Sequence, residues 1–90
     1  MAWKVKLSTL AQKNLKQLDV KTVNRLLVFL NDRVAKLDHP RMIGEALKGS
    51  KFNNLWKYRV GDYRIICDIQ DEEIQILVVR IGNRREVYRK

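Results

Sequence analysis

The alternation of hydrophobic and polar positions predicts a strand and two amphipathic helices in the first half of the chain. Trp3, Val5 and Leu7 alternate with lysines, which is the period-two pattern of a half-buried strand. A helix is expected over about residues 8–18, where apolar side chains share one helical face. A longer helix is expected over about residues 22–37, because its apolar positions recur every three or four residues. Two amphipathic helices so close in sequence predict a helical hairpin.

The second half of the chain predicts strands. Three runs rich in β-branched and aromatic residues, 55–60, 63–69 and 73–81, are separated by short turns. Short turns require antiparallel neighbours, and residues 41–54 are expected to form a loop before these strands. We therefore predict a single α+β domain over residues 1–90, in which an N-terminal strand and a two-helix hairpin pack on one face of an antiparallel sheet. The other face of the sheet is left open.

Composition and charge indicate that this domain binds polyanions. The chain has 90 residues, 46% of them hydrophobic, and a formal net charge of +9. The apolar content is that of a folded domain rather than of a disordered basic tail. A folded domain with this excess of positive charge attracts polyanions, and nucleic acid is the leading candidate. The alternative is a basic surface that serves only solubility.

Several kinds of chemistry are disfavoured by what the sequence lacks. Cys67 is the only cysteine and His39 the only histidine, so an internal disulfide is excluded and a four-ligand zinc site is nearly so. We expect neither a metal nor a cofactor. The longest apolar run, residues 26–30, is far below the roughly 18 residues that span a bilayer, and the first residues have no secretory pattern. A cytoplasmic protein without a membrane partner is therefore expected.

The cations of the second half lie on or beside the predicted strands. Lys57 and Arg59 are two residues apart and therefore share one face of their strand, while Tyr58 between them points to the core. Antiparallel pairing across the tight turn is expected to bring Arg64 close to Arg59. Arg84 and its neighbour Arg85 follow the third strand, and Tyr88 comes after them. An alternative reading is ordinary ion pairing, with Asp62, Asp68 or Glu86 neutralising Arg64 or Arg84.

Such a set of cations can act on a phosphodiester. Arginine binds phosphate oxygens with a planar two-pronged fork, and two or three arginines would stabilise the extra charge of a pentacoordinate transition state. RNA carries its own nucleophile in the 2′-hydroxyl, so neither a metal nor a Ser or Cys nucleophile is required. A base and an acid are still needed, and Tyr88 or a lysine such as Lys57 can take those roles.

Three segments resemble the RelE/ParE toxin superfamily. They are Leu47-Lys48-Gly49, the run Leu55-Trp56-Lys57-Tyr58-Arg59-Val60-Gly61-Asp62-Tyr63-Arg64-Ile65, and Ile81-Gly82-Asn83-Arg84-Arg85-Glu86-Val87-Tyr88. The resemblance covers nearly the whole chain and implies a RelE-like toxin fold. It also implies a cognate antitoxin as partner. Members of the RelE branch are messenger-RNA interferases that cleave the codon in the ribosomal A site, whereas members of the ParE branch inhibit DNA gyrase without nuclease activity.

The resemblance also implies roles for particular residues. Arg64 matches the arginine that stabilises the phosphate transition state, and Arg84 matches a second arginine near the leaving oxygen. Tyr88 matches a tyrosine that orients the substrate base, and Asn83 stands where many relatives have a histidine. The general base stays open between Lys57 and Tyr88. The expected catalytic set is Lys57, Arg59, Arg64, Arg84 and Tyr88, and further RNA contacts are expected from Lys48, Lys51, Arg85 and Arg89.

Three functions therefore remain in view. The preferred one is a ribosome-dependent, metal-independent messenger-RNA endoribonuclease toxin, whose partners are an antitoxin, the 30S A site and messenger RNA. The second is a ParE-like inhibitor of gyrase that lacks nuclease activity. The third is a plain basic RNA-binding module. The first requires the catalytic side chains to converge on one space the size of a phosphate.

Overall fold

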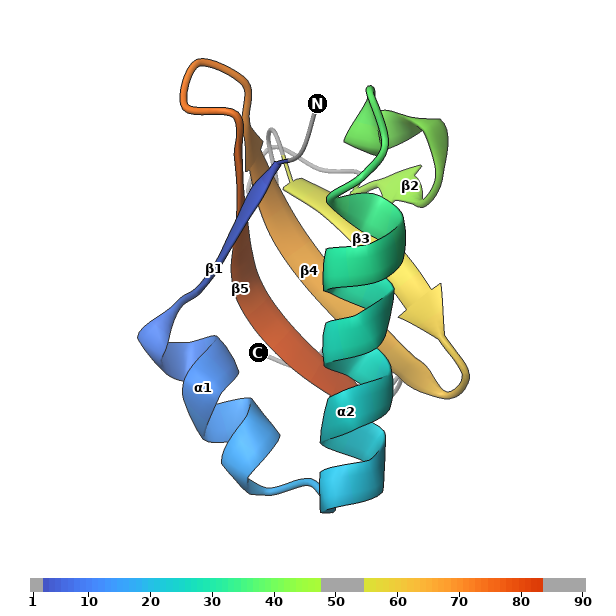
Figure 1. Ribbon diagram of the computed structural model, residues 1–90. Helices are drawn as coiled ribbons and strands as arrows, with labels where there is room; N and C mark the ends of the chain where they lie inside the picture. The colour runs from blue at the N-terminus through green and yellow to red at the C-terminus, as the bar shows by residue number, and fades with distance from the viewer. Residues whose placement is uncertain (1–2, 48–54, 84–90) are drawn as a thin grey trace.

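Two helices cover one face of a five-stranded sheet (Figure 1). The computed structural model describes residues 3–47 and 55–83. This α+β arrangement confirms the predicted fold class. In chain order the elements are β1 (Lys4–Leu7), α1 (Thr9–Lys16), α2 (Val20–Val28), the π-helical η1 (Phe29–Val34), the short 3-10 helix η2 (Pro40–Met42), β2 (Glu45–Ala46), β3 (Leu55–Val60), β4 (Tyr63–Gln70) and β5 (Gln75–Asn83).

The sheet is mixed, because one strand runs parallel to its neighbour. The strand order is β1-β5-β4-β3-β2, and all contacts among β2 to β5 are antiparallel, as predicted for strands joined by short turns. β1 instead pairs in parallel with β5. The expectation of a wholly antiparallel sheet is corrected at this edge. A parallel pair needs a long connection, and the chain between β1 and β5, which includes both helices, supplies one.

Polar side chains of the first helix hold it against the last strand. Ser8 caps α1, since its Oγ accepts a hydrogen bond from the Ala11 amide at 3.0 Å, and the same hydroxyl donates to the Val79 carbonyl at 2.7 Å. One helical turn later, the Asn14 carboxamide oxygen accepts the Ile81 N–H at 2.9 Å. The half of β5 that lies beyond β1 is therefore paired by helix side chains.

The second predicted helix continues without a break into the π-helical segment η1, so that Leu26, Leu30 and Val34 all remain buried. These side chains pack on the covered face of the sheet. The strands contribute the buried side chains of Tyr58, Val60, Ile65, Cys67, Ile76, Val78 and Ile81. Cys67 is 0% exposed, as its alternation with isoleucines predicted, and burial raises the pKa of its thiol.

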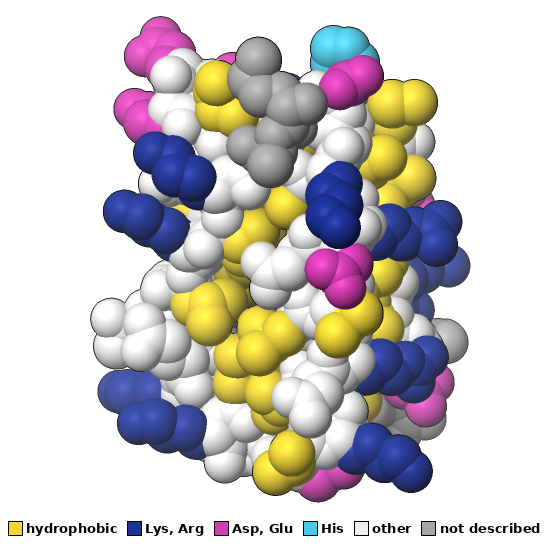
Figure 2. Space-filling view, viewed as in Figure 1, with side chains coloured by type: hydrophobic (Ala, Val, Ile, Leu, Met, Phe, Trp, Pro, Cys, Tyr) yellow, Lys and Arg dark blue, Asp and Glu magenta, His cyan; other side chains and the backbone are white. Residues whose placement is uncertain are grey.

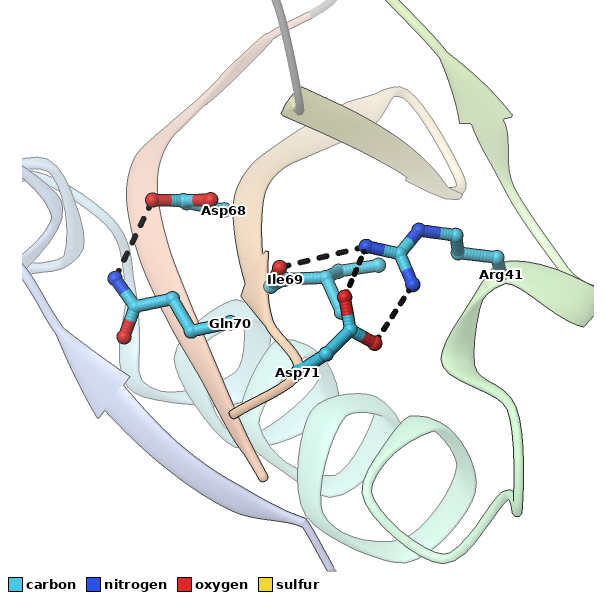
Figure 3. Close-up of polar contacts among 5 residues, drawn as sticks. All are labelled: Arg41, Asp68, Ile69, Gln70 and Asp71. Atoms are coloured by element: carbon cyan, nitrogen blue, oxygen red, sulfur yellow. Dashed lines mark hydrogen bonds and ion pairs between the residues drawn. The ribbon is translucent and has the colours of Figure 1, made fainter. Parts of the chain in front are cut away.

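Three side chains attach the segment around η2 to the sheet. The Tyr58 hydroxyl donates to the Pro40 carbonyl at 2.7 Å, and the Trp56 indole N–H donates to the Ile43 carbonyl at 2.8 Å. Arg41 makes a two-pronged ion pair with Asp71 in the β4–β5 turn, with both N···O distances 2.9 Å (Figure 3). This contact lowers the pKa of the Asp71 carboxyl. The segment predicted as a loop thus holds η2 and β2, and its residues 48–54 lie outside the described part.

Candidate functional site

The face of the sheet that points away from the helices brings two of the predicted arginines together. Arg59 in β3 is directly opposite Arg64 in β4, and Arg64 is opposite Gly82 in β5. The predicted proximity of Arg59 and Arg64 is therefore confirmed. Lys57 lies two residues before Arg59 and shares its face, while Tyr58 between them is buried in the core. Three of the five predicted catalytic residues thus lie on one side of two adjacent strands.

A carboxylate that the sequence did not reveal lies beside these cations. Glu45 in β2 is in register with Lys57, with its Oε2 3.7 Å from the Lys57 Nζ and its Oε1 3.4 Å from an Arg59 guanidinium nitrogen. It offsets part of the repulsion between the two cations. Glu45 falls in a stretch predicted as loop, and a strand of two residues has no periodicity by which to find it. The only sequence signal for this contact was the opposite charge of Glu45, and charge alone does not identify which cation a carboxylate pairs with.

Arg64 is buried although it carries a charge. Its residue is 7% exposed, and one guanidinium nitrogen donates to the Gly61 carbonyl at 3.2 Å and to the Tyr63 carbonyl at 3.0 Å. The side chain is thereby held at the β3–β4 turn. Within residues 3–47 and 55–83 no carboxylate forms an ion pair with Arg64, so neither Asp62 nor Asp68 neutralises it there. A buried cation is stabilised by a nearby anion, and a bound phosphate would supply that charge.

The other predicted site residues lie outside the described part of the chain. Asn83 is the last described residue of β5, and it is opposite Tyr63, next to the row that contains Arg64 and Gly82. The described part therefore tests neither the predicted convergence of all five side chains nor the RNA contacts. The residues concerned are Arg84 and Tyr88 of the catalytic set, and Lys48, Lys51, Arg85 and Arg89 of the RNA-binding set.

Metal ligands do not gather anywhere in the described ranges. Residues 3–47 and 55–83 contain no group of three or more His, Cys, Asp or Glu side chains that could hold a metal ion. The same residues contain no helix that is long and apolar enough to cross a membrane. His39 is exposed, as expected for its place before Pro40. The chemistry that the described site offers is that of two arginines, a lysine and one carboxylate.

Comparison with known proteins identifies the class to which this fold belongs. The structure resembles the RelBE2 toxin–antitoxin complex of Mycobacterium tuberculosis with a TM-score of 0.84, at 21% identity over 96% of this chain and 95% of that one. For the isolated Escherichia coli RelE toxin the TM-score is 0.71, at 21% identity over 97% and 92% of the two chains. For the archaeal RelE–RelB complex of Pyrococcus horikoshii it is 0.71, at 26% identity over 96% and 99%.

The fold is thus that of the small α+β toxins of type II toxin–antitoxin systems. A family model described as the ParE toxin of the type II toxin–antitoxin system parDE matches residues 5–88. The chain belongs to this family, within the RelE/ParE toxin superfamily. No curated protein matches the sequence.

Proposed function

We propose that this toxin is a ribosome-dependent messenger-RNA endoribonuclease that cleaves the codon in the ribosomal A site. The observation that carries the proposal is the pairing of Arg59 with Arg64 across β3 and β4, on the same face of the sheet as Lys57. Two arginines directly opposite each other repel, so this arrangement costs stability unless an anion binds between or beside them. Two arginines on neighbouring strands can supply two guanidinium groups to one phosphodiester.

The proposed reaction is an intramolecular transesterification of RNA. The 2′-hydroxyl loses its proton to a base and its oxygen attacks the adjacent phosphorus, while the bond to the 5′ oxygen breaks and that oxygen gains a proton. The products are a 2′,3′-cyclic phosphate and a 5′-hydroxyl, and no step requires a metal ion. Arg59 and Arg64 would stabilise the charge that develops on the phosphate oxygens.

The general base is the open part of this mechanism. Lys57 and Tyr88 remain candidates from the sequence, and the position of Glu45 adds a carboxylate next to two of the phosphate-binding cations. Arg84 would stabilise or protonate the leaving oxygen, and Tyr88 would orient the base, as the resemblance to RelE toxins implies.

A cognate antitoxin is the proposed protein partner. Several similar toxins have been solved as complexes with their RelB antitoxins, among them those from M. tuberculosis, P. horikoshii and Methanococcus jannaschii. The further proposed partners are the 30S A site and messenger RNA, which place the toxin in the cytoplasm. The second candidate function is inhibition of DNA gyrase without nuclease activity, and the observation in its favour is the match to the ParE family model.

Arg64→Ala distinguishes these functions. We expect it to abolish message cleavage, because the transition-state charge loses a buried guanidinium. In translation extracts, primer extension should show breaks in ribosome-bound message with the wild-type protein and none with the variant. Since Arg64 is buried, circular dichroism should accompany each assay to show that the variant folds. If Arg64→Ala fails to fold, Arg59→Ala replaces it as the test, because Arg59 is exposed, and it should also lose message cleavage.

Lys36→Ala, an exposed cation on the helical side, is the control and should leave cleavage intact. A folded and fully active Arg64→Ala protein would contradict the mechanism. Supercoiling by purified gyrase, measured in parallel, tests the alternative. If supercoiling stops while message stays whole, the ParE-like function replaces the one proposed here.

A further inference from the structure

Two arginines contact the β3–β4 turn, one from each side of the sheet. On the face away from the helices, Arg64 donates to the Gly61 carbonyl at 3.2 Å and to the Tyr63 carbonyl at 3.0 Å. On the helical side, the guanidinium of Arg25 in α2 lies against Gly61. A Cβ at Gly61 would be 3.1 Å from both terminal nitrogens of Arg25 and 3.4 Å from its Cζ. Both guanidinium groups therefore reach the same residue of the turn.

The contact with Arg25 depends on the missing side chain of Gly61. Gly61 has φ +60°, a conformation that glycine adopts without strain. A Cβ 3.1 Å from a nitrogen would be closer than ordinary van der Waals contact, so a larger residue here would displace the guanidinium. Glycine thus serves the turn geometry and also lets Arg25 lie directly against the turn.

Arg25 is placed by a rigid element and not by an ion pair. The next residue, Leu26, is 0% exposed, and the helical path continues through η1, so the backbone of α2 is fixed at this point. Within residues 3–47 and 55–83 no salt bridge joins Arg25 to a carboxylate. Its contact with the turn is therefore not a by-product of pairing with a neighbouring acid.

We propose that Arg25 is a positioning residue for Arg64: it packs against the helical side of the β3–β4 turn and so fixes the Gly61 carbonyl that holds the Arg64 guanidinium. Arg64 depends on such support because it is 7% exposed and is held by backbone carbonyls. A shift of the turn would move its guanidinium relative to the phosphate, and a misplacement of about 1 Å can lower a rate by about 100-fold. The inference rests on the proposed role of Arg64 in RNA cleavage.

The alternative is that Arg25 acts only through its charge. Figure 2 shows Lys and Arg side chains gathered along the side of the molecule where β3 lies, and Arg33 and Arg59 line the same hollow as Arg25 and Gly61. Removing any of these cations weakens the general attraction of RNA. The test must therefore separate the loss of a charge from the loss of the contact with the turn.

Single-turnover cleavage of ribosome-bound message by the full chain makes this separation. For Arg25→Ala we expect the maximal rate to fall about tenfold, because Arg64 stays in the site but is misaligned. The toxin concentration at half-maximal rate should change by less than about twofold. Arg25→Lys keeps the charge without the planar guanidinium, and its maximal rate should fall by about fivefold or more.

The matched control is Arg33→Ala, which removes an arginine from the same hollow while the atoms nearest Gly61 all belong to Arg25. Its maximal rate should stay within about twofold of wild type, and thermal melts should show that all three variants fold. An undiminished rate in Arg25→Ala or in Arg25→Lys would overturn the inference, as would an equal loss in Arg33→Ala.

The Arg64 guanidinium itself provides a second measurement that does not depend on cleavage. In nuclear magnetic resonance spectra of the isotope-labelled full chain, assigned with Arg64→Ala, its N–H protons should exchange slowly with water because they are buried and held by carbonyls. Arg25→Ala should speed this exchange by about tenfold or more, and Arg33→Ala should not. Unchanged exchange in Arg25→Ala would overturn the inference. Absence of message cleavage by the wild-type toxin would overturn the proposed nuclease function alone.

Discussion

At the scale of single residues, Glu45 changes the view of the site most. Without it, Lys57 and Arg59 would be two neighbouring cations on one face of the sheet. With it, each cation has a carboxylate oxygen within 4 Å, at 3.7 Å for Lys57 and 3.4 Å for Arg59. A phosphate that binds Arg59 must compete with this carboxylate, and a 2′-hydroxyl placed nearby would find a proton acceptor in it.

Glu45→Gln separates these two effects. The neutral amide no longer competes for Lys57 and Arg59, so we expect tighter binding of an RNA whose cleaved nucleotide carries a 2′-O-methyl group. The amide is also no base, so cleavage of ordinary RNA should fall by about 100-fold or more. Affinity and single-turnover cleavage are measured side by side, with Glu72→Gln in the exposed β4–β5 turn as the matched control. Undiminished cleavage by Glu45→Gln would leave Lys57 and Tyr88 as the remaining bases.

Strand periodicity and a tight turn predicted part of the site. The contacts between segments that are distant in sequence could not be predicted from such local patterns. The shared face of Lys57 and Arg59 follows from a period of two, and the pairing of Arg59 with Arg64 follows from a two-residue turn. Glu45 reaches the same face through β2, which ends at Ala46 while β3 begins only at Leu55, so no two-residue turn fixes the register of these strands. The burial of Arg64 was likewise invisible, because it results from the tertiary surroundings of β4 rather than from its own sequence.

At the scale of elements, the contact between η2 and the β4–β5 turn joins two segments that are 30 residues apart in sequence. Arg41 donates from two nitrogens to the two oxygens of Asp71, and one of these nitrogens also lies 3.4 Å from the Ile69 carbonyl (Figure 3). The pair lowers the pKa of Asp71 and raises that of Arg41. It holds the chain between the last helical turn and β2, and therefore bears on the position of Glu45.

Asp71→Asn tests this contact through the pH dependence of stability. Because the pKa of Asp71 is lower in the folded state, the ion pair stabilises the fold above the ordinary aspartate pKa of about 3.9. That contribution is lost as pH falls through the lower, folded-state value. The side chains are 41% and 61% exposed, so solvent screening limits the effect at pH 7 to about 0.5 kcal/mol.

Urea unfolding at pH 7 and at about pH 2 measures this difference. The free energy of unfolding of wild type should exceed that of Asp71→Asn at pH 7, and the two should converge in acid. Glu73→Gln, in the same turn but outside the ion pair, is the control. A difference that persists unchanged at low pH would show that Asp71 acts through something other than its charge.

The sequence predicted where the strands and helices lie along the chain more reliably than which strands pair with each other. The strands at 55–60 and 63–69 were predicted to within a residue, because tight turns bound them. The parallel pairing of β1 with β5 was not predicted, since no short turn connects them and β1 has only four residues to fix its register. The π-helical turn at Phe29–Val34 also escaped prediction, because its apolar residues keep a helical spacing that does not distinguish it from an α-helix.

At the scale of the whole molecule, the net charge of +9 on 90 residues acts in two ways. Distributed cations steer the toxin towards any polyanion, an effect that salt screens within about 10 Å at 0.1 M ionic strength. Cations that contact phosphates release counterions from RNA, which gives affinity a defined dependence on salt concentration. We propose that the cations on the sheet face away from the helices contact phosphates. The cations on the exposed helical surface would act by steering alone.

The dependence of RNA affinity on salt therefore tests this division. For single-stranded RNA the slope of log affinity against log salt is about −0.7 for each phosphate charge that is neutralised. With a 2′-O-methylated RNA that is not cleaved, Arg64→Ala should make the slope less negative by about 0.7. Lys36→Ala should leave the slope unchanged and slow association slightly, because it removes one steering charge without removing a phosphate contact. An unchanged slope in a folded Arg64→Ala protein would mean that Arg64 does not contact phosphate, and its burial would then serve the β3–β4 turn alone.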